Sequence, residues 1–335
     1  MRIAVVVAGG MGETLQATPL LRTLRAGFPQ ARISLLHPRL ATAVACGIPS
    51  ADELVPERCL EGHAGPASLI PLWLALRRRR LDATFICGGQ PALRVAAYLA
   101  GVPERVGPSG GLTSVLLTSG TPAAEHENHA ATWLRLASSL GLTVQVHAPS
   151  FDPGPEAKRE ANKLLHGTGL TDGRLLIAIV PGTSLTERNG SPVGAVGWDP
   201  QRFAFLANLL AQRHGAGIVF LGGPGDRAEI EQVQMDLGIS VADMSGELDL
   251  RIVAAIVSHC DLLVAADSPL LHIAAAVGTP AVGLFGPTDG RKRGPYGRDH
   301  RIIQALPVVQ AEERAESPMS RIRVDDVLAG IEATL

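Results

Sequence analysis

The N-terminal stretch of the chain reads Ile3-Ala4-Val5-Val6-Val7-Ala8-Gly9-Gly10-Met11-Gly12-Glu13. Its first five residues form a continuous apolar run, which is typical of a parallel strand buried on both faces. The glycines that follow permit a tight turn and a close approach of backbone to a ligand. Beyond the turn, Leu20, Leu21, Leu24 and Phe28 recur at helical spacing. A buried strand, a glycine turn and an amphipathic helix together predict an α/β fold with a parallel sheet.

The same alternation continues along the chain. In the first half it predicts strands over 32–36, 83–87 and 105–107, and helices over 69–80, 91–99 and 127–140. A run of prolines and glycine over 149–155 then indicates a linker. The second half predicts strands over 175–180, 218–221, 261–265 and 281–285, and helices over 199–213, 227–237, 249–259, 269–277 and 324–335. Two domains are expected, 1–152 and 153–320, with a terminal helix in 321–335.

The composition limits the classes of protein that the chain can belong to. The chain has 335 residues, enough for about two domains at roughly 150 residues each. Lys and Arg number 30 and Asp and Glu 32, so the net charge of −2 argues against nucleic-acid binding. The four cysteines are too few and too scattered for a disulfide scaffold or a zinc site, and we expect them to be buried, reduced thiols.

No segment has the pattern of a secretory signal or of a membrane span. We therefore expect a cytoplasmic location. The apolar stretch 67–76 ends at Arg77-Arg78-Arg79-Arg80. It is either a helix lying on a membrane surface or an ordinary amphipathic helix with a solvated basic end, so membrane contact is at most peripheral.

The stretch Ala266-Asp267-Ser268-Pro269-Leu270-Leu271-His272 follows a strand and opens a helix. Ser268 is suited to cap that helix and Pro269 to its first position. The amides of Leu270 and Leu271 would then face an anion, with His272 one turn along on the same face. The alternative is a capped core helix whose histidine has an internal partner.

Three further turns follow strands. Gly286-Pro287-Thr288-Asp289-Gly290 precedes three cations, Arg291 to Arg293, which suit an anionic ligand or a solvated loop. Pro181-Gly182-Thr183-Ser184 offers hydroxyl donors. In Gly222-Gly223-Pro224-Gly225-Asp226, the carboxylate of Asp226 either accepts from a ribose hydroxyl or caps a helix. Glu13, at the first turn, is either a catalytic acid or base or a helix-start acid.

One motif suggests a metal but misses the required spacing. His126-Glu127-Asn128-His129 places two histidines at i and i+3, whereas the zinc-protease pattern is H-E-x-x-H. We expect no metal and no cofactor.

Taken in order, these motifs resemble those of the ADP-heptose:lipopolysaccharide heptosyltransferases, glycosyltransferase family 9. Met11 to Pro19 is similar to that family's M-G-D-x-x-x-T-x-P opening. Asp267 to Pro280 is similar to its D-[ST]-G-x-x-H-x-x-A-A-x-x-x-P motif, and Gly286 to Asp289 to its G-P-T-D. The resemblance extends over nearly the whole chain.

This resemblance implies a GT-B fold, in which two Rossmann-like domains with parallel sheets face a central cleft. It implies an N-terminal acceptor-binding domain and a C-terminal nucleotide-sugar-binding domain. Glu13 stands at the position of the catalytic base. The implied donor-binding residues are Thr183, Ser184, Asp226, Leu248, Asp267, Ser268, Pro269, Leu270, Leu271, His272 and Thr288.

The chain departs from the family pattern at three positions. Glu13 stands where the family has an Asp as base, and Pro269 replaces the family's glycine and removes an amide donor. The lysine of the family's K-x-W-P is Val196 here, so Arg188, Arg291 or Lys292 is expected to replace it in donor binding.

The resemblance implies an inverting, metal-independent glycosyltransferase. Its donor would be a nucleotide diphosphate sugar such as ADP-heptose, and its acceptor the lipopolysaccharide core or a small natural product. The alternatives are a GT-B module that binds nucleotide sugars without transferring them, and a nucleotide-sugar epimerase. Candidate acceptor-binding cations are Arg39, Arg58, Arg94, Arg105 and Arg77 to Arg80.

Overall fold

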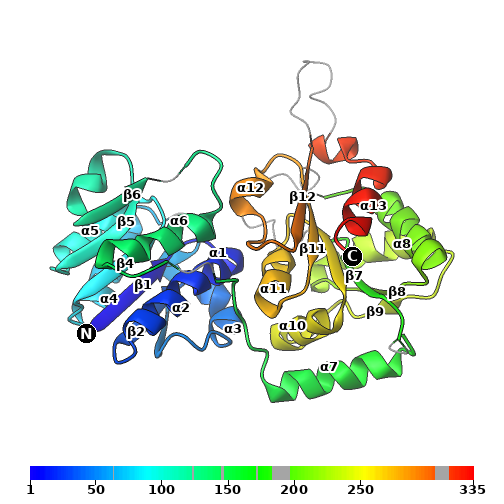
Figure 1. Ribbon diagram of the computed structural model, residues 1–335, viewed down its shortest axis with the longest axis horizontal. Coiled ribbons are helices and arrows are strands. Elements are labelled where there is room, and N and C mark those ends of the chain that lie inside the picture. The colour runs from blue at the N-terminus through cyan, green and yellow to red at the C-terminus, as the bar shows by residue number, and fades with distance from the viewer. Residues whose placement is uncertain (63, 123, 145–146, 171–172, 183–196, 306–316) are drawn as a thin grey trace. The chain divides into compact units, whose positions relative to one another are not determined.

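A computed structural model describes residues 1–335 except 63, 123, 145–146, 171–172, 183–196 and 306–316. The internal contacts divide the chain into two compact units, Met1–Asp152 and Pro153–Leu335. Each unit is an α/β sandwich built on one parallel sheet (Figure 1). This confirms the predicted α/β class with two Rossmann-like sheets.

The first unit contains a six-stranded sheet in the order β3-β2-β1-β4-β5-β6, parallel throughout. Its strands are β1 (Arg2–Val7), β2 (Arg32–His37), β3 (Glu53–Pro56), β4 (Ala83–Cys87), β5 (Glu104–Ser109) and β6 (Ser119–Pro122). The central strands β1 and β4 are almost wholly buried, as their continuous apolar sequences require.

Helices cover both faces of this sheet. They are α1 (Met11–Gln16), α2 (Thr18–Gly27), α3 (Thr42–Ala45), α4 (Leu69–Arg77), α5 (Pro91–Leu99) and α6 (His129–Arg135). Short 3-10 helices lie at η1 (Arg39–Ala41), η2 (Arg58–Leu60), η3 (Pro66–Ser68), η4 (Leu112–Leu116) and η5 (Leu136–Leu140). One core forms between the sheet and α2, α6 and η5, and a second between the opposite face and α4 and α5.

The second unit repeats this plan with the order β12-β11-β10-β7-β8-β9. Its strands are β7 (Leu176–Val180), β8 (Gly217–Phe220), β9 (Ala242–Asp243), β10 (Leu262–Ala266), β11 (Ala281–Phe285) and β12 (His300–Gln304). Counted from the first strand of each unit, both sheets have the order 3-2-1-4-5-6 of dinucleotide-binding folds.

The helices of the second unit are α7 (Pro155–Gly167), α8 (Pro200–His214), α9 (Arg227–Met235), α10 (Leu250–His259), α11 (Pro269–Val277), α12 (Gly290–Arg293) and α13 (Val324–Glu332), with 3-10 helices η7 (Pro224–Asp226) and η9 (Pro318–Arg321). The terminal helix α13 packs on α8, β11 and β12 (Figure 1), and its buried side chains belong to the hydrophobic core of the second unit. On the other face α10 lies between α7 and α11.

Several predicted elements differ from those observed. The helix expected over 69–80 ends at Arg77, and Arg80 takes a left-handed conformation with φ 47°. The helix expected over 127–140 begins at His129, because Asn128 accepts a hydrogen bond from the amide of Ala130, and it continues as 3-10 helix after Arg135. The strands β3, β6, β9 and β12 and the helices α3, α7 and α12 were not predicted.

The strand order locates the edge at which ligands are expected to bind. In open parallel sheets, ligands bind beyond the carboxyl ends of the strands where the strand order reverses. That point lies between β1 and β4 in the first unit, and between β7 and β10 in the second. Glu13 follows β1, and Asp267 and Ser268 follow β10.

Candidate functional site

Glu13 lies in the first turn of α1, directly beyond the carboxyl end of β1, and is half-buried. Its Oε2 accepts a hydrogen bond of 2.9 Å from the amide of Gly10. The side chain folds back over Gly9, where a Cβ would lie 2.8 Å from Cδ of Glu13. Gly9 has φ 130°, which few other residues adopt. Gly9 is therefore required for the position of this carboxylate, which caps the helix at the predicted binding edge.

The segment after β3 lies against the same turn. The amide of Gly9 donates to the carbonyl of Leu60 at 2.9 Å, and the amide of Gly62 donates to the carbonyl of Gly9 at 3.1 Å. Arg58 precedes this contact and Arg39 follows β2, so both lie at the carboxyl edge of the sheet, and both are exposed. They are the two exposed candidate acceptor-binding cations at the same edge as Glu13.

The other candidate cations either lie at the opposite edge of the sheet or are bonded within the first unit. Arg2, the first residue of β1, donates from Nη1 to the carbonyl of Arg79 at 3.3 Å, so the run Arg77 to Arg80 lies at the opposite, amino edge of the sheet. Six residues of strand separate the two edges by about 20 Å. Arg94 is buried and donates to the carbonyls of Pro108 and Gly110, both at 2.7 Å. Arg94 therefore lies near the carboxyl edge, but its guanidinium is buried and held by carbonyl oxygens beyond β5, so it is not exposed to an acceptor as Arg39 and Arg58 are.

The side chain of Arg105 is bonded within the first unit. It stands at the start of β5, donates from Nε to the carbonyl of Leu116 at 2.6 Å, and places its guanidinium carbon 5.5 Å from the ring centre of Tyr98. Its predicted acceptor role therefore has no support in its surroundings.

In the second unit, α11 begins as its sequence predicted. Ser268 is buried and caps the helix, and Pro269 occupies the first turn. The amide of Leu270 donates to Oγ of Ser268 at 3.3 Å, and that of Leu271 to the carbonyl of Ser268 at 3.1 Å. Both amides thus have partners inside the turn, so an anion would have to share or replace these hydrogen bonds. His272 is half-buried one turn further on.

Asp267 and Thr288 come together from two different strand ends. Asp267 follows β10 and Thr288 follows β11, and Oγ1 of Thr288 donates to Oδ2 of Asp267 at 2.8 Å. Both side chains are half-buried. The hydrogen bond orients the carboxylate of Asp267, which the family resemblance implied to be a donor-binding residue.

The Thr288 loop has a second support that the sequence did not predict. Gln304, at the end of β12, donates from Nε2 to the carbonyl of Gly286 at 2.8 Å and accepts at Oε1 from the amide of Gly290 at 2.9 Å. The side chain bridges both ends of the loop. A single glutamine in a half-buried edge strand carries no motif, so only the strand pairing locates it.

The cations beyond this loop are partly neutralised. Asp289 caps α12, and Nε of Arg291 donates to its Oδ1 at 3.0 Å. Lys292 is half-buried on the same short helix.

Asp226 is only 1% exposed, and its Oδ2 accepts from the amide of Gly223 at 2.7 Å. A Cβ on Gly182 would lie 2.1 Å from its carboxyl group. Of the two interpretations of Asp226, the structure shows the turn-capping contact. Leu248 is half-buried just before the cap of α10. Thr183, Ser184 and Arg188 lie outside the described residues, as does Val196.

The cysteines and histidines of the described ranges do not form a metal site, since no group of three potential ligands gathers there. Cys87 and Cys260 are buried, but Cys46 is exposed and Cys59 is half-buried, so the expectation of four buried thiols was wrong. Burial raises the pKa of Cys260 to about 12 and of Cys59 to about 11, which leaves little reactive thiolate at neutral pH. Within the part of the chain that the structure describes, no helix is long and apolar enough to cross a bilayer.

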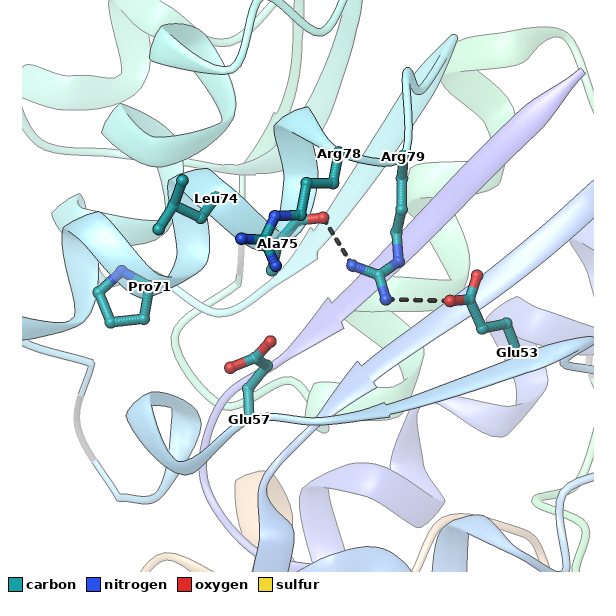
Figure 2. Close-up of a pocket in the computed structure, with 7 residues that line it drawn as sticks. All are labelled: Glu53, Glu57, Pro71, Leu74, Ala75, Arg78 and Arg79. Carbon is teal, nitrogen blue, oxygen red and sulfur yellow. Dashed lines mark hydrogen bonds and ion pairs between the residues drawn. The ribbon is translucent and has the colours of Figure 1, made fainter.

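A hollow of about 490 Å³ opens between α4 and the edge strand β3 (Figure 2). Arg79 crosses it, donating from Nη1 to the carbonyl of Ala75 at 2.6 Å and pairing with Oε1 of Glu53 at 2.9 Å. Glu57 and Arg78 line the same hollow. It contains none of the residues predicted for catalysis or donor binding.

Residues 94–322 match the family model of glycosyltransferase family 9 (heptosyltransferase). Lipopolysaccharide heptosyltransferase 2 of Escherichia coli K12 is 24% identical, over 91% of this chain and 88% of that protein. Lipopolysaccharide heptosyltransferase 3 of Escherichia coli is 29% identical, over 97% and 96%.

Solved structures agree on the fold. The family 9 glycosyltransferase of Veillonella parvula DSM 2008 superposes with a TM-score of 0.82 at 22% identity, covering 99% of this chain and 96% of that one. Escherichia coli heptosyltransferase WaaC with ADP gives 0.71 at 18% identity, with both chains covered fully. The fold is that of the GT-B glycosyltransferases. The chain belongs to glycosyltransferase family 9, the heptosyltransferases, as its motifs implied.

Proposed function

We propose that this glycosyltransferase moves a heptose-type sugar from ADP-heptose to an acidic acceptor of the lipopolysaccharide core, with inversion and without a metal ion. The observation that carries the proposal is the position of its motif carboxylates. Glu13 and Asp267 each follow the strand at which the order of their own sheet reverses. The named relatives are lipopolysaccharide heptosyltransferases, and a solved relative carries ADP-2-deoxy-2-fluoro heptose, which supports the donor class.

In the proposed reaction, Glu13 takes the proton of an acceptor hydroxyl. The acceptor oxygen forms a bond to the anomeric carbon as the bond from that carbon to the diphosphate oxygen breaks, and ADP leaves. Acid–base catalysis of this kind contributes about 10²- to 10⁴-fold to a rate. The hydrogen bond from Gly10 holds the carboxylate in one orientation before the acceptor binds.

The second unit is proposed to bind the donor. Asp267, oriented by Thr288, would accept from sugar hydroxyls, while Ser268 and His272 would contact the diphosphate. The positive end of the α11 dipole favours such an anion. Arg188, which lies outside the described residues, and Lys292 remain the proposed replacements for the family lysine.

The first unit is proposed to bind the acceptor. Its exposed Arg39 and Arg58 lie at the Glu13 edge, where they suit the carboxylates or phosphates of an acidic core sugar. Changing both to glutamine should raise the acceptor KM and leave the donor KM unchanged.

The direct test compares the wild type with Glu13→Gln, using ADP-heptose, a lipopolysaccharide-core acceptor and mass spectrometry of the products. We expect turnover to fall about 10²- to 10⁴-fold while donor affinity by calorimetry stays the same. Glu61→Gln is the matched control, because Glu61 pairs with Gly9 beside the same turn. Turnover unchanged in Glu13→Gln would remove the base from the mechanism.

Two other outcomes would replace the proposal. Tight donor binding with no product from any acceptor would indicate a binding module, and a new sugar nucleotide formed from donor alone would indicate an epimerase. The anomeric configuration of the product by NMR tests inversion, and full activity in EDTA is expected.

A further inference from the structure

The outer face of α4 carries exposed apolar side chains in a row. Leu72, Ala75 and Leu76 pack toward the sheet, whereas Ile70 is 67% and Leu74 37% exposed. These two are one turn apart, so they lie on one side of the helix. Arg77 and Arg78 follow at the next turn and are also exposed. The helix therefore has an apolar outer stripe that ends in cations.

Further exposed apolar side chains lie on the elements that pack beside α4. Nε1 of Trp73 donates to the carbonyl of Leu99 at 3.2 Å, which joins α4 to the end of α5. Both Tyr98 and Leu99 are about half exposed, and η4, which packs on α5, exposes Leu112 and Val115 almost completely. Among the described residues, six of the ten exposed large hydrophobic side chains lie on α4, α5 and η4. We call the exposed residues Ile70, Leu74, Tyr98, Leu99, Leu112 and Val115 the apolar face.

The cations beside this face are not neutralised. Glu53 is paired with Arg79 and Arg32, and Asp82 lies 4.0 Å from the N-terminal amine. Within the described ranges, no acid forms an ion pair with Arg77, Arg78 or Arg80. Arg80 also occupies a left-handed position that glycine normally takes after a helix. Arg80 is thus an arginine at a position where glycine would adopt the left-handed backbone conformation with less strain.

Arg78 is one of the residues that line the hollow drawn in Figure 2. Arg78 and Leu74 border the hollow between α4 and β3, with Glu57 on the opposite wall. Two acids, Glu53 and Glu57, line the hollow, and Glu53 is paired with Arg79. The four arginines Arg77 to Arg80 outnumber these two acids, so the net charge next to the apolar face is positive.

This combination identifies one kind of partner. Apolar side chains with a tryptophan and flanking arginines are typical of segments that lie in the interface of a lipid bilayer. A second copy of the chain fits less well, because a twofold contact places the same patch on itself and would bring the unpaired arginines of both copies together. Anionic headgroups complement these arginines.

We propose that the apolar face of the first unit docks on an anionic phospholipid bilayer, with Arg77, Arg78 and Arg80 on the headgroups. This docking surface is additional to the proposed transfer reaction and does not depend on it. Glu13 follows the carboxyl end of β1, whereas the arginines lie at the amino edge. Membrane docking and sugar transfer thus use different residues.

The test is flotation of the full chain with vesicles of phosphatidylethanolamine and phosphatidylglycerol, and with vesicles of phosphatidylcholine alone. We expect binding to the anionic vesicles that weakens with added salt. Changing Arg77, Arg78 and Arg80 together to glutamine should weaken it about 100-fold, since each cation near such a surface contributes about fivefold. Ile70→Glu with Leu74→Glu should weaken it about tenfold or more.

The matched control is Phe205→Glu with Met235→Glu, two side chains that are 55% and 81% exposed on the second unit. This variant should float like the wild type, and all variants should keep the wild-type Tm. Equal flotation of Ile70→Glu/Leu74→Glu and wild type would overturn the proposal. The proposal would also be overturned if the wild type did not bind vesicles but formed a concentration-dependent dimer that Ile70→Glu/Leu74→Glu abolished. Turnover on a water-soluble acceptor should be unchanged in every variant, which separates this result from failure of the proposed function.

Discussion

Thr288 donates a hydrogen bond of 2.8 Å from Oγ1 to Oδ2 of Asp267, and so connects the ends of two adjacent strands, β11 and β10. The two residues are 21 positions apart in the chain. The bond orients a half-buried carboxylate at the carboxyl edge of the sheet, where an open α/β fold binds its ligand.

Thr288→Val should therefore impair donor binding. Valine keeps the shape of threonine but cannot donate, and a hydrogen bond to a charged group contributes about 1.5–3 kcal/mol. We expect the donor KM to rise about tenfold or more, as measured by steady-state ADP release. Thr288→Ser keeps the hydroxyl and should behave like the wild type. A donor KM unchanged in the valine variant would mean that Asp267 does not contact the sugar.

Gly182→Ala should destabilise the second unit. The added Cβ would lie 2.1 Å from the carboxyl group of Asp226, and so would displace the carboxylate from the amide of Gly223. Overpacking of this kind costs about 1–3 kcal/mol, and urea unfolding should show a loss in that range. Gly167→Ala is the control, since a Cβ there has no neighbour within 4 Å. Equal unfolding free energies for Gly182→Ala and the wild type would contradict the packing described.

Stability should decrease on acidification because of His37. The ring is fully buried, and burial lowers its pKa, an effect that the contact of Nδ1 with the carbonyl of Pro38 at 2.8 Å only partly opposes. With the folded pKa below the unfolded value of about 6.5, the unfolded chain binds the proton first, so stability is full above about pH 6.5 and falls below it.

The measurement is Tm at about pH 7 and pH 5, for the wild type and His37→Asn. Asparagine can still donate to Pro38 but does not titrate, so the variant should lose less Tm. Burial also lowers the pKa of His300, so the Tm of His37→Asn should still fall between about pH 7 and pH 5, by less than that of the wild type. An equal fall in Tm in the two proteins would show that His37 does not contribute to the pH dependence of stability.

Arg80→Gly should stabilise the first unit by about 1 kcal/mol, because a left-handed conformation costs an L-residue about 1–2 kcal/mol that glycine avoids. Arg78→Gly, two residues earlier, has φ −61° and should instead lose about 0.5–1 kcal/mol. Urea unfolding of the two variants tests both signs. A stabilised Arg80→Gly that also binds anionic vesicles less well would show that this arginine is retained at the expense of stability.

Much of the fold could be predicted from local sequence. The strand over 83–87 and the helices over 91–99 and 269–277 were predicted with their observed limits, because continuous apolar runs and proline in the first turn are local signals. The edge strands β3 and β12 were missed, since they are only partly buried and contain polar residues. Helix α7 was missed because it begins within the proline-rich stretch that indicated a linker.

The candidate site, like the fold, could be predicted only in part from the sequence. By itself, the sequence determined which turns follow strands, and it placed Glu13, Asp267 and Ser268 in them. Only the tertiary structure decided that Glu13 folds back on Gly10, that Thr288 orients Asp267 and that Gln304 supports the Thr288 loop. It also decided that the Arg77 to Arg80 run lies at the edge opposite Glu13. These relationships depend on strand order and register, which arise from contacts between distant parts of the chain and leave no local pattern in the sequence.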